Sequence, residues 1–222
     1  MSAQEYRLII VSGPTREWID PVRFLSNASS GRTGWHLATH GKDYFREVTY
    51  ISGPVADRFQ KVAGVTNIQV ETTADMARAV QNEVGDRAVL IMAAAPADYT
   101  PEQLSPHKIK KSDNENITLK LKPTTDILKS LIPISTELKS FYRIGFAAET
   151  ENIEDYAGRK LQEKNLDFIC ANAVYQSQTG FGDTENTLIV FDRSLTAHII
   201  GPHDKETLTR KLIDYIIHKL SL

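Results

Sequence analysis

The segment AVLIMAAA at residues 88–95 decides the fold class. It has no polar side chain, whereas a strand with one face in water alternates apolar and polar residues. A strand that is apolar throughout is buried on both faces, which is typical of a parallel sheet covered by helices on each side. The segments before it agree, because an amphipathic helix is predicted at 73–84 and a short apolar strand at 7–12.

Strands and helices alternate along most of the chain. Strands are predicted at 7–12, 47–52, 67–71, 88–95, 142–149 and 167–172. Helices are predicted at 30–43, 73–84, 125–133 and 153–164. After a loop at 174–186 come two more strands and a last helix, at 186–192, 196–201 and 205–220. This order predicts an α/β fold: a Rossmann-like, mostly parallel sheet with helices on both faces, in a single domain spanning residues 1–222.

Residues 98–122 interrupt the alternation with a polar, lysine-rich insertion that we expect to form a flap. It contains one alternating segment, NITLKLK, which predicts a strand at 116–122. The segment HKIKK supplies Lys108, Lys110 and Lys111. Such a charge run is usually a solvated surface, but a lysine-bearing flap could also close over a triphosphate.

The composition excludes several classes of protein. With 26 basic and 28 acidic residues the net charge is -2, which argues against binding nucleic acid through bulk electrostatics. The single cysteine, Cys170, excludes a disulfide framework and a cysteine-based zinc site. The N-terminus does not read as a signal peptide, and no apolar run is long enough to span a bilayer. We therefore expect a soluble cytoplasmic protein without membrane contact.

The segment SNASSGRTG at 26–34 is the first candidate binding loop. It lies between a predicted strand and helix, where small residues and the helix N-terminus can present backbone N–H groups to phosphate. The same residue types also suit an ordinary helix cap, so the residues alone leave both readings open. The P-loop ending is absent, and only Gly31 and Gly34 match part of the dinucleotide fingerprint.

The predicted helix at 153–164 is the second candidate. Its apolar face is marked by residues that recur every four positions, Ile153, Ala157 and Leu161. Lys160 and Lys164 fall on that face, and two lysines at this spacing repel each other unless an anion neutralises them. Both could instead extend out of the helix edge into solvent.

Two further features leave alternatives open. Tyr156 and Lys160 have the Tyr-x-x-x-Lys spacing of short-chain dehydrogenases, in which the lysine could lower the pKa of the phenol. An NAD(P) oxidoreductase is therefore an alternative, although the glycine motif expected after the first strand is missing. Asp98 follows the buried strand and could bind a metal, a ribose or a base amino group, or cap the next turn.

Seven segments resemble, in order, those of the phosphopantothenoylcysteine synthetases of coenzyme A biosynthesis, and they cover nearly the whole chain. They are SGPTRE (12–17), DPVRFLSNASSGRTG (20–34), AAAPADY (93–99), KIKK (108–111), IGFAAETEN (144–152), KNLDFICAN (164–172) and GFGDTEN (180–186). The likeness is closer to the bacterial form, which uses CTP, than to the eukaryotic form, which uses ATP. The chain departs from the family's pattern at Pro14, Pro96, Thr125 and Ala173.

The resemblance implies roles for particular residues. Nucleotide contacts are implied for Ser30, Gly31, Ala93, Ala94, Asp98, Lys108, Thr125, Asp126, Ile127, Leu128, Phe146, Lys160 and Lys164. Substrate contacts are implied for Arg23, Asn27 and Asn172, and catalytic roles for Asn27 and Lys108.

The resemblance also implies the reactants and partners. It implies CTP with Mg²⁺, 4'-phosphopantothenate and cysteine, in a homodimer with shared active sites. Because the chain begins at the synthetase strand, we expect no flavin, and a separate flavin-dependent decarboxylase that acts on the product. The residues do not specify the Mg²⁺ ligands. A non-catalytic nucleotide-binding subunit is a third alternative.

Overall fold

The computed structural model describes residues 2–110, 116–149, 153–173 and 185–222. Lys111, the last three residues of the IGFAAETEN segment and nearly all of the loop predicted at 174–186 lie outside the described residues. The GFGDTEN segment is described only at its last two positions.

An eight-stranded sheet forms the centre of the fold, in the order β12-β11-β10-β9-β6-β1-β4-β5. The parallel strands are β1 (Arg7–Ser12), β4 (Glu47–Ser52), β5 (Thr66–Gln69), β6 (Ala88–Met92), β9 (Phe141–Glu149) and β10 (Phe168–Ala173). An antiparallel hairpin, β11 (Asn186–Asp192) and β12 (Ala197–His203), extends one edge. The predicted Rossmann-like, mostly parallel sheet is confirmed.

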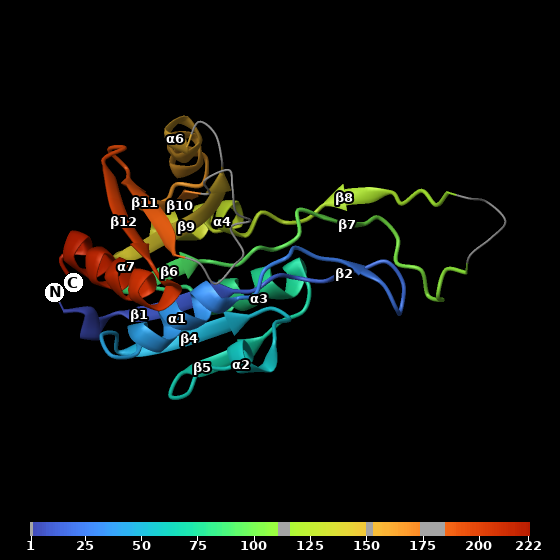
Figure 1. The fold of residues 1–222 in the computed structure, drawn as a ribbon, viewed down its shortest axis with the longest axis horizontal. Coiled ribbons are helices and arrows are strands. Elements are labelled where there is room, and N and C mark those ends of the chain that lie inside the picture. The colour runs from blue at the N-terminus through green and yellow to red at the C-terminus, as the bar shows by residue number, and fades with distance from the viewer. Residues whose placement is uncertain (1, 111–115, 150–152, 174–184) are drawn as a thin grey trace.

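Helices cover both faces of the sheet, as predicted (Figure 1). One face carries α1 (Arg32–Gly41) and α7 (Lys205–Leu220). The other carries α3 (Thr73–Glu83), α4 (Ile127–Ser130) and α6 (Ile153–Glu163). Strand β1 packs against both helical layers because its side chains alternate. Leu8 and Ile10 pack in the core with α1 and α7, and Ile9 and Val11 in the core with α3, α4 and α6.

The most central strands are buried, as the sequence predicted. Every residue of β6 is buried, and Cys170 is a fully buried core residue whose thiol pKa is raised by burial. Short helices complete the body: η1 (Ala3–Glu5), α2 (Asp57–Gln60) and α5 (Ile132–Glu137). Among the described helices, none combines the length and apolar character needed to cross a bilayer.

The single helix predicted at 125–133 is wrong. The chain forms two short helices there, α4 and α5, which meet at Leu131. Pro133 lies in the first turn of α5, and a proline cannot donate the backbone hydrogen bond that would continue α4. Thr125 and Asp126 precede α4, and the Asp126 carboxylate caps it.

Two hairpin arms project from one end of the body (Figure 1). Arm 1 contains β2 (Glu17–Trp18) and β3 (Phe24–Leu25), and arm 2 contains β7 (Tyr99–Pro101) and β8 (Leu121–Pro123). Arm 2 is the predicted flap, but the strand predicted at 116–122 is wrong in extent. Ile117 and Leu119 are exposed, so no core surface supports a longer strand there. Arm 1 was not predicted, because two-residue strands leave no periodic signal.

Buried hydrogen bonds fix the roots of both arms against helix α3. The Thr15 hydroxyl, at the root of arm 1, accepts a bond of 2.9 Å from the backbone N–H of Ala97, at the root of arm 2. It also shares a 2.9 Å bond with the hydroxyl of Thr73. The buried Glu17 carboxylate accepts the Thr73 backbone N–H at 2.8 Å, at the positive end of α3. The arms are therefore anchored where they leave the sheet.

We predict that Gly34→Ala destabilises the fold. A Cβ at Gly34, in α1, would overlap the side chain of Ser12 at the end of β1, so helix and strand would have to separate. Overpacking of this kind costs about 1–3 kcal/mol. Denaturant unfolding measures the effect.

Gly158→Ala in α6 is the matched control. The added methyl would meet only the mobile end of Leu195, at 3.3 Å, and alanine favours the helix by up to about 1 kcal/mol. Equal unfolding free energies for the two variants would show that α1 does not need this close approach.

Candidate functional site at the carboxyl edge of the sheet

Two cavities open at the carboxyl ends of the central parallel strands. There the chain order reverses, because β1 has β4 on one side and β6 on the other, and open α/β sheets bind ligands at such points. The α1 cavity, of about 290 Å³, lies beside the start of α1, and the α4 cavity, of about 200 Å³, beside the start of α4. Ala94 and Phe146 line both, so the cavities are neighbours.

The α1 cavity brings together residues from distant parts of the sequence. Among those implied by the resemblance, it collects Ser30, Gly31, Ala93, Ala94, Phe146 and Asn172. Helix α1 begins at Arg32, two residues later than predicted, because Gly31 takes a left-handed conformation with φ of 70°. The Ser12 hydroxyl donates a 2.8 Å bond to the Gly31 carbonyl and holds this turn against β1.

The α1 cavity also contains two cations that the sequence analysis missed. Arg32 is the first residue of α1 and Lys205 the first residue of α7, and both line the cavity. A cation at a helix N-terminus opposes the helix dipole, so two of them facing one cavity favour a bound anion. For Arg32, the signal in the sequence was its position directly after SSG, near the start of a predicted helix.

The α4 cavity collects the remaining nucleotide residues at the sheet edge. It is lined by Asp98, Thr125, Asp126, Ile127, Leu128 and Lys164, together with the shared Ala94 and Phe146. The Asp126 carboxylate accepts the Lys129 backbone N–H at 3.2 Å and pairs with the Lys164 ammonium at 3.0 Å. The Lys164 side chain is only 17% exposed, so this ion pair holds its charge at the cavity wall.

Lys160 lies differently from Lys164. It does not line either cavity, and its ammonium lies 4.9 Å from the centroid of the Tyr156 ring. A dehydrogenase pair would instead place the lysine beside the phenol hydroxyl in the substrate cavity. The geometry of Tyr156 and Lys160 therefore gives no support to the oxidoreductase alternative.

The arms place Arg23 next to the lysine-bearing segment of the flap. The buried Asp20 carboxylate of arm 1 accepts hydrogen bonds from the Arg23 guanidinium and, at 3.1 Å, from the Ile109 backbone N–H of arm 2. Arg23 in turn donates a 2.8 Å bond to the Ile109 carbonyl. The Arg23 guanidinium holds the pKa of Asp20 far below its usual range. Arg23 and Lys108, distant in sequence, are thus brought to one junction between the arms.

Asn27 links arm 1 to the edge of the α1 cavity. Its side-chain amide donates to the carbonyls of Ala95 at 3.2 Å and Pro96 at 3.0 Å. Ala95 lines the α1 cavity, so Asn27 lies at the rim between the cavity and the arms. Arg23, Asn27 and Lys108 do not line either cavity.

The carboxylates of the site fit a metal ion carried by phosphate. Among the described residues, no group of three or more His, Cys, Asp or Glu is placed to hold a metal ion. Mg²⁺ commonly takes only one or two protein carboxylates and binds the substrate's phosphate oxygens. The two carboxylates of the α4 cavity are Asp98 and Asp126, of which Asp126 already caps α4 and pairs with Lys164.

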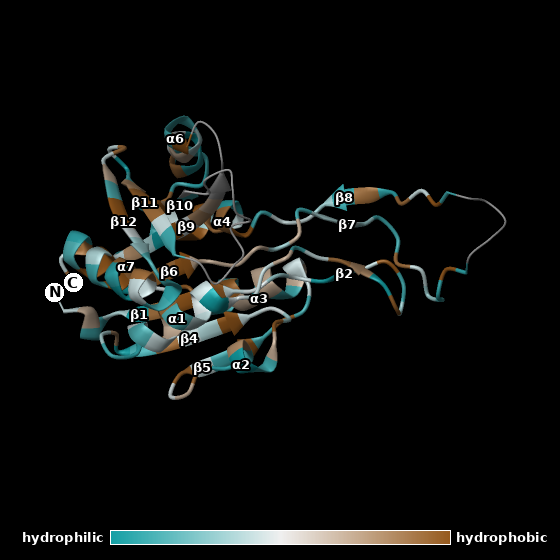
Figure 2. Ribbon diagram, viewed as in Figure 1, coloured by the Kyte–Doolittle hydropathy of each residue, from teal (hydrophilic) through white to brown (hydrophobic). Residues whose placement is uncertain are grey.

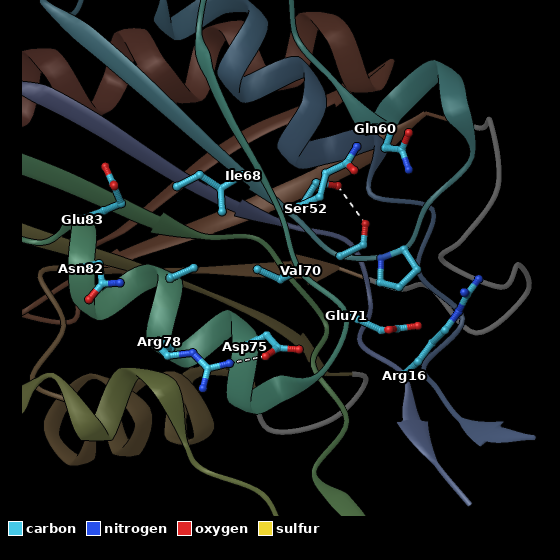
Figure 3. A pocket seen from close by; sticks show the side chains of 14 residues that line it. Arg16, Ser52, Gln60, Ile68, Val70, Glu71, Asp75, Arg78, Asn82 and Glu83 are labelled. Atoms are coloured by element: carbon cyan, nitrogen blue, oxygen red, sulfur yellow. Dashed lines mark hydrogen bonds and ion pairs between the residues drawn. The ribbon is translucent and has the colours of Figure 1, made fainter. Parts of the chain in front are cut away.

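A larger cavity, of about 680 Å³, lies on the other side of β1, between α3 and the ends of strands β4 and β5 (Figure 3). Its carboxylates are Glu71, Asp75 and Glu83. Its two cations, Arg16 and Arg78, are outnumbered by these carboxylates, and Arg78 pairs with Asp75. An excess of carboxylates would repel a triphosphate, whereas the charged residues of the α1 cavity are both cations, which favours the α1 cavity for an anion.

Comparison with known proteins identifies the family. Residues 3–220 match the family model of the DNA/pantothenate metabolism flavoprotein C-terminal domain. The chain belongs to this family. It is 42% identical over 214 residues to the coenzyme A biosynthesis bifunctional protein CoaBC of Vibrio cholerae, and 43% identical over 185 residues to that of Bacillus subtilis. It covers 52% and 44% of those proteins, and so spans about half the length of the curated relatives it matches.

Two solved structures share the fold. The C-terminal domain of a CoaBC protein is 34% identical, with a TM-score of 0.79 over 100% of this chain and 99% of that chain. A variant of Cab2 in complex with phosphopantothenate-cysteine has a TM-score of 0.75 over 98% of this chain and 87% of that chain. At 13% identity, the likeness to Cab2 shows a common fold.

On the nucleotide role that the resemblance implies for Lys164, we predict that Lys164→Ala weakens binding of Mg–CTP about tenfold or more, because a charge-assisted contact to phosphate would be lost. The free energy of unfolding should change by about 1 kcal/mol or less, because the Asp126 carboxylate that loses its partner is 36% exposed to water and keeps its bond from the Lys129 N–H. Isothermal titration calorimetry and denaturant unfolding measure the two effects.

Lys129→Ala is the control. Lys129 pairs with Glu163 at 3.3 Å and does not line either cavity. Equal CTP affinity in the two variants would remove Lys164 from the nucleotide site.

Proposed function

We propose that this chain is a phosphopantothenate–cysteine ligase that uses CTP. The observation that carries the proposal is the α1 cavity, where Arg32, Lys205 and the start of α1 favour an anion. It lies in a chain that covers 99% of a CoaBC C-terminal domain at 34% identity. The names of the relatives, which refer to coenzyme A biosynthesis, support the choice of reaction.

The nucleotide would lie along the carboxyl edge of the sheet, across both cavities. The triphosphate would meet the backbone of Ser30 and Gly31 and the ammonium group of Lys164. The resemblance also implies a contact from Lys160, which does not line either cavity and would have to turn from the Tyr156 ring to reach the phosphates. Phe146, which lines both cavities, would pack near the base. Ala93, Ala94, Asp98 and the segment 125–128 would hold the base and ribose, and Asn172 the acyl substrate.

The proposed reaction has two steps. The carboxylate of 4'-phosphopantothenate attacks the α-phosphorus of CTP, pyrophosphate leaves with its Mg²⁺, and an acyl-cytidylate forms. The amine of cysteine then attacks the acyl carbon, CMP leaves, and the amide is formed with release of the amine proton. A carboxylate is a poor acyl donor and a mixed anhydride a good one, which is why a nucleotide is consumed.

The arms would supply the groups around the reacting centre. Lys108 would stabilise the charge that develops on the phosphates, and Asn27 would orient the acyl intermediate. The junction of Asp20, Arg23 and Ile109 supports a joint role for Lys108 and Asn27. It fixes the segment of Lys108 relative to arm 1, from which Asn27 follows. The protein's contribution would be positioning and charge stabilisation.

A homodimer with shared sites would explain the surface of the arms. They expose large apolar side chains: Val22, Phe24, Tyr99, Leu104, Ile117 and Leu121. Figure 2 shows hydrophobic stretches along the ribbon of the arms. Two-stranded ribbons are only marginally stable alone, and exposed apolar patches mark interaction surfaces. The occupant we propose is the arm pair of a second copy, with Arg23 reaching the partner's substrate.

The product carries a carboxylate next to the new amide, and we propose that a flavin-dependent decarboxylase outside these 222 residues removes it. No flavin is needed for the ligation. The substrates are soluble metabolites, so we propose a cytoplasmic location without nucleic acid or membrane partners.

Pyrophosphate release with Mg²⁺, 4'-phosphopantothenate and either CTP or ATP, before and after adding cysteine, tests the function. Release with CTP that becomes sustained turnover with cysteine is expected, and light scattering of the same sample should give the mass of a dimer. Nucleotide binding without release would instead indicate the non-catalytic subunit. In that case Thr125 and Ala173, where the chain departs from the family's pattern, would be the first positions to change.

We predict that Lys108→Gln lowers the rate of pyrophosphate release about 100-fold or more, because a charge aimed at the transition state is lost. The unfolding free energy should be unchanged, since Lys108 is exposed. Lys120→Gln, at the exposed residue just before β8 in the same arm, is the control. Near-normal release by the Lys108 variant would remove Lys108 from the reaction.

A further inference from the structure

His36 lies one helical turn after Arg32 on helix α1, and the two side chains are in contact. The Arg32 Nε–H donates to Nε2 of His36 at 3.4 Å. His36 is only 7% exposed, whereas Arg32 lies at the edge of the α1 cavity. The imidazole packs edge-on against Trp35, with ring centroids 5.1 Å apart, and stacks with His40 at 6.3 Å. A buried, packed ring thus contacts the inner nitrogen of the guanidinium.

We propose that His36 is a positioning residue, which holds the Arg32 guanidinium toward the α1 cavity so that Arg32 binds the triphosphate, and that it does so only while its imidazole is neutral. The inference rests on the proposed function for the identity of the triphosphate, but its geometry applies to any polyphosphate in that cavity. An arginine held in place loses less side-chain freedom on binding than a mobile one.

The chemistry requires the neutral imidazole. A neutral ring has one nitrogen that accepts, whereas the protonated ring only donates and would repel the guanidinium. Burial and the nearby Arg32 charge lower the pKa of His36 from its ordinary value of 6.5. His40 also lowers that pKa, while Glu206 and Asp204 of α7 act in the opposite direction. The contact is therefore complete near neutral pH and is lost as pH falls through the lowered pKa.

Calorimetric titration with inorganic tripolyphosphate and with Mg–CTP tests the inference, at about pH 8 and at a pH below the lowered pKa of His36, which NMR titration of its ring protons locates. At the higher pH, Arg32→Gln should weaken binding about tenfold or more, and His36→Leu about three- to tenfold. His36→Gln should bind as the wild type does, because the glutamine carbonyl can accept the same bond.

The pH dependence separates positioning from a merely structural role. Between the two pH values the wild type should lose affinity relative to His36→Gln, whose acceptor does not titrate. Dividing the wild-type affinity by that of His36→Gln cancels the titration of the phosphate itself, which affects both proteins equally. His218→Gln is the control, since His218 is exposed near the end of α7 and is not among the groups that shift the pKa of His36, and it should keep the wild-type pH dependence.

The outcomes distinguish this inference from the ligase. Wild-type affinity in His36→Leu at the higher pH, or a wild-type to His36→Gln ratio that does not change with pH, would overturn the inference. If Arg32→Gln binds as the wild type does while the wild type makes pyrophosphate, the inference fails and the ligase stands. Tripolyphosphate binding that depends on both Arg32 and His36, without ligase turnover, would support the inference and count against the ligase.

Discussion

The parallel pairing of β1 with β6 is the constraint on which the rest of the structure depends. The two strands run side by side in register, with Val11 opposite Met92, and so end at the same edge of the sheet. The pairing continues beyond β6, where the Ala93 N–H donates to the Val11 carbonyl and the Ala95 N–H to the Gly13 carbonyl, each at 2.9 Å. Both arms leave from this edge, and both cavities open beside it. A change in strand order would separate the two arms and the two cavities from one another.

Charge at this edge differs from charge over the whole chain. The net charge is -2, yet Arg32, Lys205 and Lys164 line two adjoining cavities. A nearly neutral protein that places cations in small cavities suits a small phosphorylated molecule, because nucleic acid needs a broad basic surface. The fold supplies part of this field itself, through the N-terminus of α1 that borders the α1 cavity. In the larger cavity beside α3, carboxylates outnumber the two arginines.

The sequence predicted strands and helices correctly where burial leaves a periodic pattern of apolar residues, and it failed where burial leaves no such pattern. Strand order along the chain, the uniformly buried β6 and the two helical layers follow from patterns repeated over several residues. The helix predicted at 125–133 failed because the effect of Pro133 was underweighted. Arm 1 was missed because its strands are short and its stability comes from long-range bonds, such as those of Thr15 and Asp20. No local pattern encodes such bonds.

The sequence by itself determined the α/β class, the burial of the central strands and the motif residues that define the family. Only the tertiary structure decided which of those residues meet. Lys160 and Lys164 look equivalent on a helical face, yet only Lys164 lines a cavity. Arg32 and Lys205 lie far apart in sequence, yet both line the α1 cavity. The physical reason is that periodicity reports each residue's local face, whereas convergence depends on strand order, which long-range pairing sets.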